Sequence, residues 1–242
     1  GNNYKRIDFL HYCGDLIIMS GLLFISGVLF TAITISLFQL IGFNIEDFYF
    51  ENVVVWGLPS IPLIASYLIF NNKDLVSKIS PIIAKIFTPF VFLILSIFSF
   101  AIIFSDKNIL VDRELLLMFN IIIIAVLALI LFSLSHINNS NKFQFILLFS
   151  LSIISIIDNL IVLFAISSRL FEFGITPNRL VLTGLNLVAS FHLVIISKQL
   201  LLLILEKANT NNILNSIVRY LPIYVFWTAI VVFLFPIIFN FK

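Results

Sequence analysis

The chain has 242 residues, of which 61% are hydrophobic and 11% charged, with a mean hydropathy of +1.17 and a net charge of +2. A soluble domain is roughly 45–50% apolar and about 25% charged, so composition argues against a soluble globular domain and against disorder. The balanced charge argues against a nucleic-acid partner. With one cysteine, no intrachain disulfide can form. The class that remains is a multi-pass integral membrane protein.

Seven apolar stretches approach the roughly 20 residues that a membrane-spanning helix needs. They are Leu16–Ile41, Val53–Phe70, Ile82–Phe104, Leu115–Leu134, Phe143–Ile166, Leu180–Leu205 and Tyr220–Phe239. Their apolar residues do not alternate as in a membrane barrel, and only helices then satisfy the backbone in lipid. We expect an all-α bundle of about seven spans, one domain over residues 1–242, with connections of about 7 to 15 residues. Whether this range is a piece of a longer protein stays open.

Lys and Arg are distributed unevenly between the two ends of the predicted spans. On the side of the N-terminus lie Lys5, Arg6, Lys73, Lys78, Lys85, Lys142, Lys198, Lys207 and Arg219, and on the other side Lys107, Arg113, Arg169, Arg179 and Lys242. Because cytoplasmic connections carry more Lys and Arg, we expect a cytoplasmic N-terminus. The connection after the first span holds Glu46, Asp47 and Glu51 without a cation, which suits the outer face.

The fifth predicted span contains an acid, Asp158, in its central region. An ionisable side chain in a membrane helix costs about 2.5–3.5 kcal/mol on insertion scales, and it faces the bundle interior where it finds partners. Ser152, Ser155 and Asn159 recur at helical spacing beside it. The stripe indicates either a proton or substrate site in the core, or a single buried acid that a neighbouring helix satisfies.

The sixth predicted span carries a line of polar residues on one helical face. They are Arg179, Thr183, Asn186, Ser190 and Ser197, at steps of four, three, four and seven. Such a line favours hydrogen bonding to a neighbouring helix, and we expect that neighbour to be the face that holds Asp158. The line suits a ligand path and ordinary packing equally. His192 lies off the line, and we interpret it as a hydrogen-bonded packing residue.

The stretch between the fifth and sixth spans has the signals that end one helix and begin another. Gly174 suits a left-handed C-terminal position, Thr176 suits an N-cap, and Pro177 suits the first helical turn. Arg169 and Glu172 are spaced to pair across one turn. This pattern needs no catalytic role to explain it.

The same stretch resembles a loop in bacterial multi-pass membrane proteins that are catalogued as a domain of unknown function. The residues that carry the resemblance are Arg169, Glu172, Phe173, Gly174, Ile175, Thr176, Pro177, Asn178 and Arg179. Where that family often has tyrosine before the glycine, this chain has Phe173. The resemblance covers about a dozen residues and implies a protein of the bacterial inner (plasma) membrane. It implies no substrate, reaction or cofactor.

Three functional hypotheses follow. The leading one is a transport-related or solute-binding module with a polar core around Asp158, the titrating group, and Arg179, an anion or headgroup contact. Its candidate binding residues are Asp158, Asn159, Arg169, Glu172, Asn178, Arg179 and Asn186. The second is a structural or regulatory scaffold that packs against a partner protein, and the third is an enzyme acting on lipid.

Whether the protein is an enzyme stays open, although the sequence favours a protein without enzymatic activity and indicates no catalytic residue. It contains no nucleophile–base pair, no HExxH and no glycine-rich phosphate loop. No group of His, Cys, Asp and Glu has metal-ligand spacing, so we expect no metal and no cofactor. The expected partners are membrane lipid and either a small solute or another protein.

Overall fold

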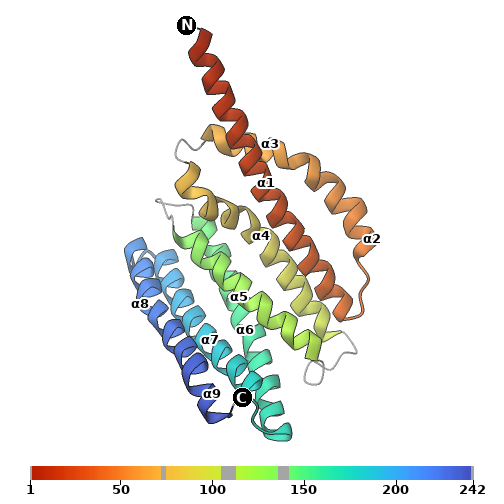
Figure 1. The fold of residues 1–242 in the computed structure, drawn as a ribbon, viewed down its shortest axis with the longest axis vertical. Helices are drawn as coiled ribbons and strands as arrows, with labels where there is room; N and C mark the ends of the chain where they lie inside the picture. Colours follow the sequence, from red (N-terminus) through yellow and green to blue (C-terminus); the bar gives the residue numbers. More distant parts are fainter. Residues whose placement is uncertain (1, 72–74, 105–112, 136–141, 241–242) are drawn as a thin grey trace. The chain divides into compact units, whose positions relative to one another are not determined.

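The computed structural model describes residues 2–71, 75–104, 113–135 and 142–240 (Figure 1). These residues form helices and short connections without a strand, which confirms the all-α prediction. The helices are α1 Asn2–Leu40, α2 Glu46–Tyr49, α3 Val55–Asn71, α4 Leu75–Ile103, α5 Arg113–Ser135, α6 Lys142–Phe173, α7 Pro177–Ile204, α8 Thr210–Ala229 and α9 Phe235–Ile238. Two π-helical turns, Phe50–Val54 and Ile230–Leu234, join α2 to α3 and α8 to α9.

Seven helical stretches in the described residues are long and apolar enough to cross a membrane. They are Tyr12–Leu40, Glu46–Asn71, Pro81–Ile102, Glu114–Leu134, Lys142–Phe173, Pro177–Ile204 and Thr210–Ile238. Each overlaps one predicted span, so the seven-span prediction is confirmed. Together with the composition, these helices indicate a multi-pass transmembrane protein.

Several predicted boundaries are wrong. The second span begins at Glu46 and the seventh at Thr210, so that the acids expected in the first connection lie in helical turns. Between α6 and α7 only residues 174–176 remain outside a helix, which is shorter than any connection that the sequence predicts. Hydropathy marks the part of a helix that suits lipid, whereas an established helix continues readily through polar residues.

The chain divides into two compact units, Gly1–Ile83 and Ala84–Lys242, and the division falls inside α4. In the first unit α1 packs against α3. The hydroxyl groups of Tyr12 and Ser66 are hydrogen-bonded across this contact at 2.8 Å, and the rings of Tyr12 and Phe70 lie 5.5 Å apart. The single domain that the sequence predicts stays a prediction.

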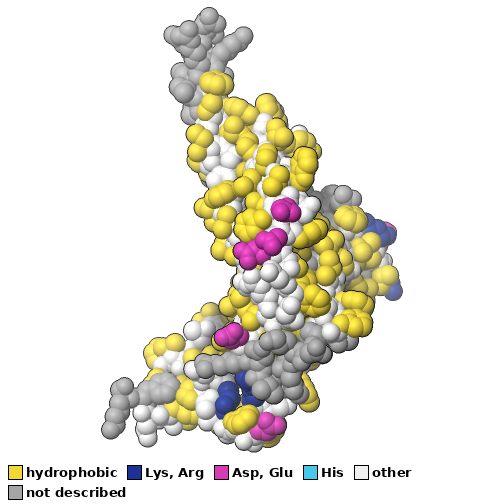
Figure 2. Space-filling view, turned by 90° about the vertical axis from the view of Figure 1, so that its right-hand side faces the viewer, with side chains coloured by type: hydrophobic (Ala, Val, Ile, Leu, Met, Phe, Trp, Pro, Cys, Tyr) yellow, Lys and Arg dark blue, Asp and Glu magenta, His cyan; other side chains and the backbone are white. Residues whose placement is uncertain are grey.

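In the second unit α6 packs against α5 and α7, and α7 packs against α8 (Figure 1). The core of this unit contains large side chains that are almost completely buried, among them Phe98, Phe119, Leu151, Leu193 and Leu200. The rings of Phe98 and Phe119 lie 5.3 Å apart and join α4 to α5. Hydrophobic side chains also cover much of the outer surface (Figure 2), as expected of helices that face lipid.

Candidate functional site: a polar core and an arginine-lined pocket

Asp158 of α6 is buried, with only 3% of its surface exposed, and it faces α4. The Ser99 hydroxyl lies 3.0 Å from each carboxylate oxygen. The same hydroxyl lies 2.7 Å from the carbonyl oxygen of Leu95. Because a serine has one hydroxyl proton, Ser99 can donate to the carboxylate or to the carbonyl, but not to both at once.

The neighbouring residue Asn159 faces α7 and begins a chain of amide hydrogen bonds. Its Nδ2 donates to the carbonyl oxygen of Asn186 at 3.0 Å and to Oγ of Ser190 at 2.9 Å. Asn186 in turn donates from Nδ2 to Oδ1 of Asn120 on α5. Asn120 donates from its own Nδ2 to the carbonyl oxygen of Leu116 at 2.6 Å. Three helices are therefore connected through buried amide groups.

The predicted polar line of α7 does pack against a polar stripe of α6. Besides the asparagines, Ser152 of α6 and Ser197 of α7 are hydrogen-bonded through their hydroxyl groups at 2.8 Å. On α6, Asn159 donates the hydrogen bonds to α7, whereas the carboxylate of Asp158 accepts from Ser99 of α4. Successive residues of a helix point about 100° apart, so adjacent polar residues serve different neighbours.

One atom of this network has no partner. Asn159 is completely buried, and its Oδ1 accepts no hydrogen bond from the described residues. An unpaired buried acceptor costs free energy comparable to a lost hydrogen bond. The core therefore keeps an acceptor that a water molecule or a ligand with an N–H or O–H group can use.

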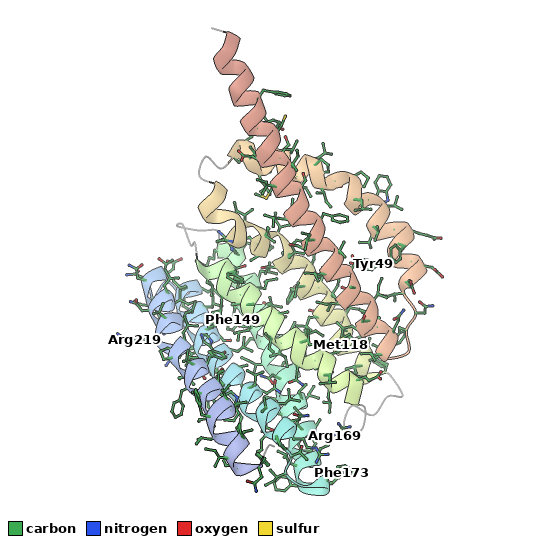
Figure 3. All side chains as sticks on the ribbon, in the orientation of Figure 1. Tyr49, Met118, Phe149, Arg169, Phe173 and Arg219 are labelled. Atoms are coloured by element: carbon green, nitrogen blue, oxygen red, sulfur yellow. The ribbon has the colours of Figure 1, made fainter. Side chains whose placement is uncertain are left out.

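A pocket of about 540 Å³ lies within the second unit, where α6 ends and α7 begins. Its polar lining consists of Arg169, Thr176, Asn178 and Arg179. Its apolar lining consists of Leu116, Leu117, Ile166, Val181 and Leu182. Figure 3 labels Arg169 and Phe173 near this end of α6. Because Leu116 both lines the pocket and accepts the hydrogen bond from Asn120, the amide chain begins at the pocket wall.

The turn that forms the pocket folds as the sequence predicts. Gly174 has a positive φ of 78°, the left-handed conformation that favours glycine. Thr176 is extended and occupies the N-cap of α7, and Pro177 follows in the first turn. The Thr176 side chain makes no capping hydrogen bond, so the cap is set by backbone conformation, and Thr176 is also one of the residues that line the pocket.

Arg179 is held in position by the end of α6. Its Nη1 donates to the carbonyl oxygens of Phe173 and Gly174 at 3.1 and 2.8 Å. The guanidinium carbon lies 5.7 Å from the centre of the Phe173 ring, a cation–π distance. The phenyl ring of Phe173 supplies this contact without a hydroxyl group.

The structure brings the predicted site residues together in two groups and leaves two residues apart. Arg169, Asn178 and Arg179 line the pocket, and Asn159 and Asn186 lie in the amide chain. Asp158 contacts α4, and Glu172 is exposed and not among the pocket residues. The Arg169–Glu172 ion pair stays a prediction.

Sequence reasoning missed Ser99 and Asn120. Asn120 interrupts an apolar run of α5, a signal comparable to that of Asn186, and could have been found. Ser99 gives no such signal, because its span also contains Ser96 and both hydroxyls bond to their own helix backbone. A serine that bonds to a preceding carbonyl is ordinary in membrane helices.

His192 of α7 packs among aromatic residues of α8. Its Nδ1 lies 3.1 Å from the Tyr224 hydroxyl, and its ring stacks on Tyr220 with centroids 4.4 Å apart. This agrees with its interpretation as a packing residue. Among the described residues no group of three His, Cys, Asp or Glu side chains could hold a metal ion.

Comparisons with protein-family models, with curated proteins and with solved structures found no match to this chain. The resemblance of the Arg169–Arg179 stretch to a bacterial membrane family therefore stays a prediction.

Proposed function

We propose that this protein is a transport-related or solute-binding membrane protein that uses the polar core of its second unit. The observation that carries the proposal is the chain of buried amides from the pocket wall at Leu116, through Asn120 and Asn186, to Asn159. Polar side chains are expensive inside a membrane bundle, and an ionisable one such as Asp158 points to a functional site.

Each part of the core has a distinct role in this proposal. The pocket with Arg169 and Arg179 receives the ligand at the end of the bundle. The unpaired Oδ1 of Asn159 accepts a hydrogen bond from the ligand or its water deeper in the bundle. Asp158 acts as the titrating group, with the Ser99 hydroxyl as its hydrogen-bond partner.

The proposed setting is the bacterial inner membrane, with the N-terminus in the cytoplasm. The excess of Lys and Arg on the N-terminal side supports this orientation. Because the seven spans alternate in direction, the α6–α7 turn then lies on the outer face. A ligand would reach the arginine-lined pocket from outside the cell.

Uptake by proteoliposomes tests the role of Asp158. Vesicles with wild type, Asp158→Asn or Asp47→Asn are compared with empty vesicles, using labelled inorganic phosphate, acetate and glycine as probes. Asp47→Asn is the matched control, because it is the same change at an exposed acid. We expect wild type and the control to take up at least one probe faster than empty vesicles, and Asp158→Asn to lose most of this uptake. Equal uptake by wild type and Asp158→Asn would exclude the assigned role.

The exposed apolar side chains do not favour the scaffold alternative. Trp56 and Phe226, for example, are 75% and 68% exposed, but lipid covers such surfaces as readily as a protein partner does. The lipid-enzyme alternative gains nothing from the described residues near the pocket, since neither aspartate nor glutamate lines it. Solute handling is therefore the function that the geometry supports best.

A further inference from the structure

The pocket at the α6–α7 turn combines positive charge with an apolar wall. Arg169 and Arg179 line it together with Thr176 and Asn178, and no acidic residue among the described residues does. Its volume of about 540 Å³ falls in the range of roughly 300–1,000 Å³ that is usual for small-ligand sites. Its charge selects for an anion.

Arg179 is positioned to bind an anion before the ligand arrives. Two backbone carbonyls hold its Nη1, and the guanidinium carries further N–H donors besides that atom. A guanidinium that is already fixed loses less freedom on binding, and its fork of donors matches the oxygens of phosphate. The first turn of α7 adds backbone N–H groups and the positive end of the helix dipole.

The number of donors favours phosphate over a carboxylate. The guanidinium of Arg179, the Thr176 side chain and the Asn178 amide together offer more hydrogen bonds than one carboxylate can accept with good geometry, whereas phosphate presents three or more acceptor oxygens. Apolar residues from three helices, such as Leu117, Ile166 and Val181, form the rest of the wall. They suit a hydrocarbon segment beside the charged group.

We infer that this pocket binds the phosphate headgroup of an anionic amphiphile, either a phospholipid or a soluble phosphate ester. The inference rests on the proposed function, because it names the ligand class of the same polar region. The polar lining comes from the C-terminal part of α6, the α6–α7 turn and the first turn of α7, and the apolar contacts come from α5, α6 and α7.

Asn178→Asp tests the inference without disturbing the arginines. Asn178 is exposed and is the second residue of α7, where a negative charge stabilises a helix. The variant should therefore fold while it places a repelling charge in the pocket. Asn211→Asp is the matched control, because Asn211 is exposed and is the second residue of α8, outside the pocket.

The probes are hexyl phosphate, inorganic phosphate and hexyl glucoside, titrated into the full chain in phosphatidylcholine nanodiscs. We expect hexyl phosphate to bind wild type and Asn211→Asp equally, and more tightly than the other two probes. Asn178→Asp should weaken its binding by about tenfold or more, which is about 1.4 kcal/mol. Equal affinity in wild type and Asn178→Asp, or equal affinity for hexyl phosphate and inorganic phosphate, would overturn the inference, as would absence of binding.

Native mass spectrometry distinguishes the two sources of the ligand. Phosphatidylglycerol that stays on wild type but leaves Asn178→Asp identifies a phospholipid, and hexyl phosphate binding without retained lipid identifies a soluble ester. The uptake experiment tests the proposed transport role independently of the pocket assignment. If Asp158→Asn leaves uptake unchanged while Asn178→Asp loses hexyl phosphate, the proposed transport role falls and the pocket assignment stands.

Discussion

The side-chain amide of Asn159 donates hydrogen bonds through its N–H groups, but its side-chain oxygen accepts none from the described residues. Nδ2 contacts acceptors on α7, whereas Oδ1 has no donor among the described residues. Removing one member of such a network leaves further groups unpaired, and the cost depends on which atoms lose partners. The loss of folding stability on substitution along the amide chain therefore measures how much these hydrogen bonds stabilise the contacts between the helices.

Asn186→Leu should destabilise the folded protein. The substitution keeps the approximate volume but removes the donor to Oδ1 of Asn120. Interhelical hydrogen bonds of this kind contribute about 0.5–2 kcal/mol in membrane bundles, and we expect a loss in that range. Unfolding in mixed detergent micelles measures it, with Leu187→Ala, at a side chain that is 43% exposed, as the control. A larger loss in the control would contradict the prediction.

Ser99→Ala should destabilise the protein by about 1–2 kcal/mol, because it leaves a buried carboxyl without its hydroxyl partner. The double variant Ser99→Ala/Asp158→Leu should recover part of that loss, since both polar partners are then removed. The same unfolding measurement checks both variants. A double variant that is less stable than Ser99→Ala would show that Asp158 has another stabilising contact.

From the sequence, the polar residues that face the interior of the bundle could be predicted better than their hydrogen-bond partners. Burial of Asp158 and of the Asn186 face follows from the cost of polar groups in lipid. The partner of Asp158 does not follow, because the rotation of α4 about its axis decides whether Ser99 faces α6. The local pattern does not single out Ser99, because Ser96 precedes it by three residues and both hydroxyls bond to carbonyls of their own helix.

At the scale of elements, α7 and α8 approach closely at Gly184. This residue is buried, and a Cβ placed on it would overlap the indole ring of Trp227. Small residues are common where membrane helices meet, because they let a neighbour come near the backbone. The sequence signal was present, since Gly184 lies within the sixth predicted span, but only the structure identifies the aromatic ring that fills the space.

Gly184→Ala should destabilise the α7–α8 contact by about 1–3 kcal/mol, the usual cost of overpacking. Combining it with Trp227→Leu should reduce that cost, because the ring that clashes is removed. Gly27→Ala in α1 is the control, since a Cβ there meets nothing within 4 Å and alanine favours a helix over glycine. Thermal unfolding in detergent measures all three, and a neutral Gly184→Ala would contradict the packing.

For the whole molecule, hydropathy alone predicts seven spans and an all-α fold, and the structure confirms both. Which helices pack together is not contained in hydropathy, because lipid and protein interiors are similarly apolar. The polar line of α7 was informative for that reason: its partners had to be polar residues of another helix. Helix ends were predicted poorly wherever a polar turn continued the helix, as before Tyr220 in α8.

Cysteine labelling should establish the orientation of the molecule. In a Cys13→Ser background, Ile175→Cys lies in the α6–α7 turn and Asn209→Cys in the α7–α8 connection. With a cytoplasmic N-terminus, we expect a membrane-impermeant maleimide to label residue 175 in intact cells and residue 209 only after lysis. The reverse pattern would place the pocket on the cytoplasmic side, and labelling of both from outside would contradict seven alternating spans.

Because only residues 174–176 separate α6 from α7, we expect these two helices to enter the bilayer as one hairpin. Asn159 and Ser152 of α6 are hydrogen-bonded to Asn186, Ser190 and Ser197 of α7, so a hairpin of these two helices satisfies much of its polarity within itself. Lipid then meets mainly aliphatic and aromatic side chains. The polar groups of the proposed solute path would thus also favour the pairing of α6 with α7 during folding.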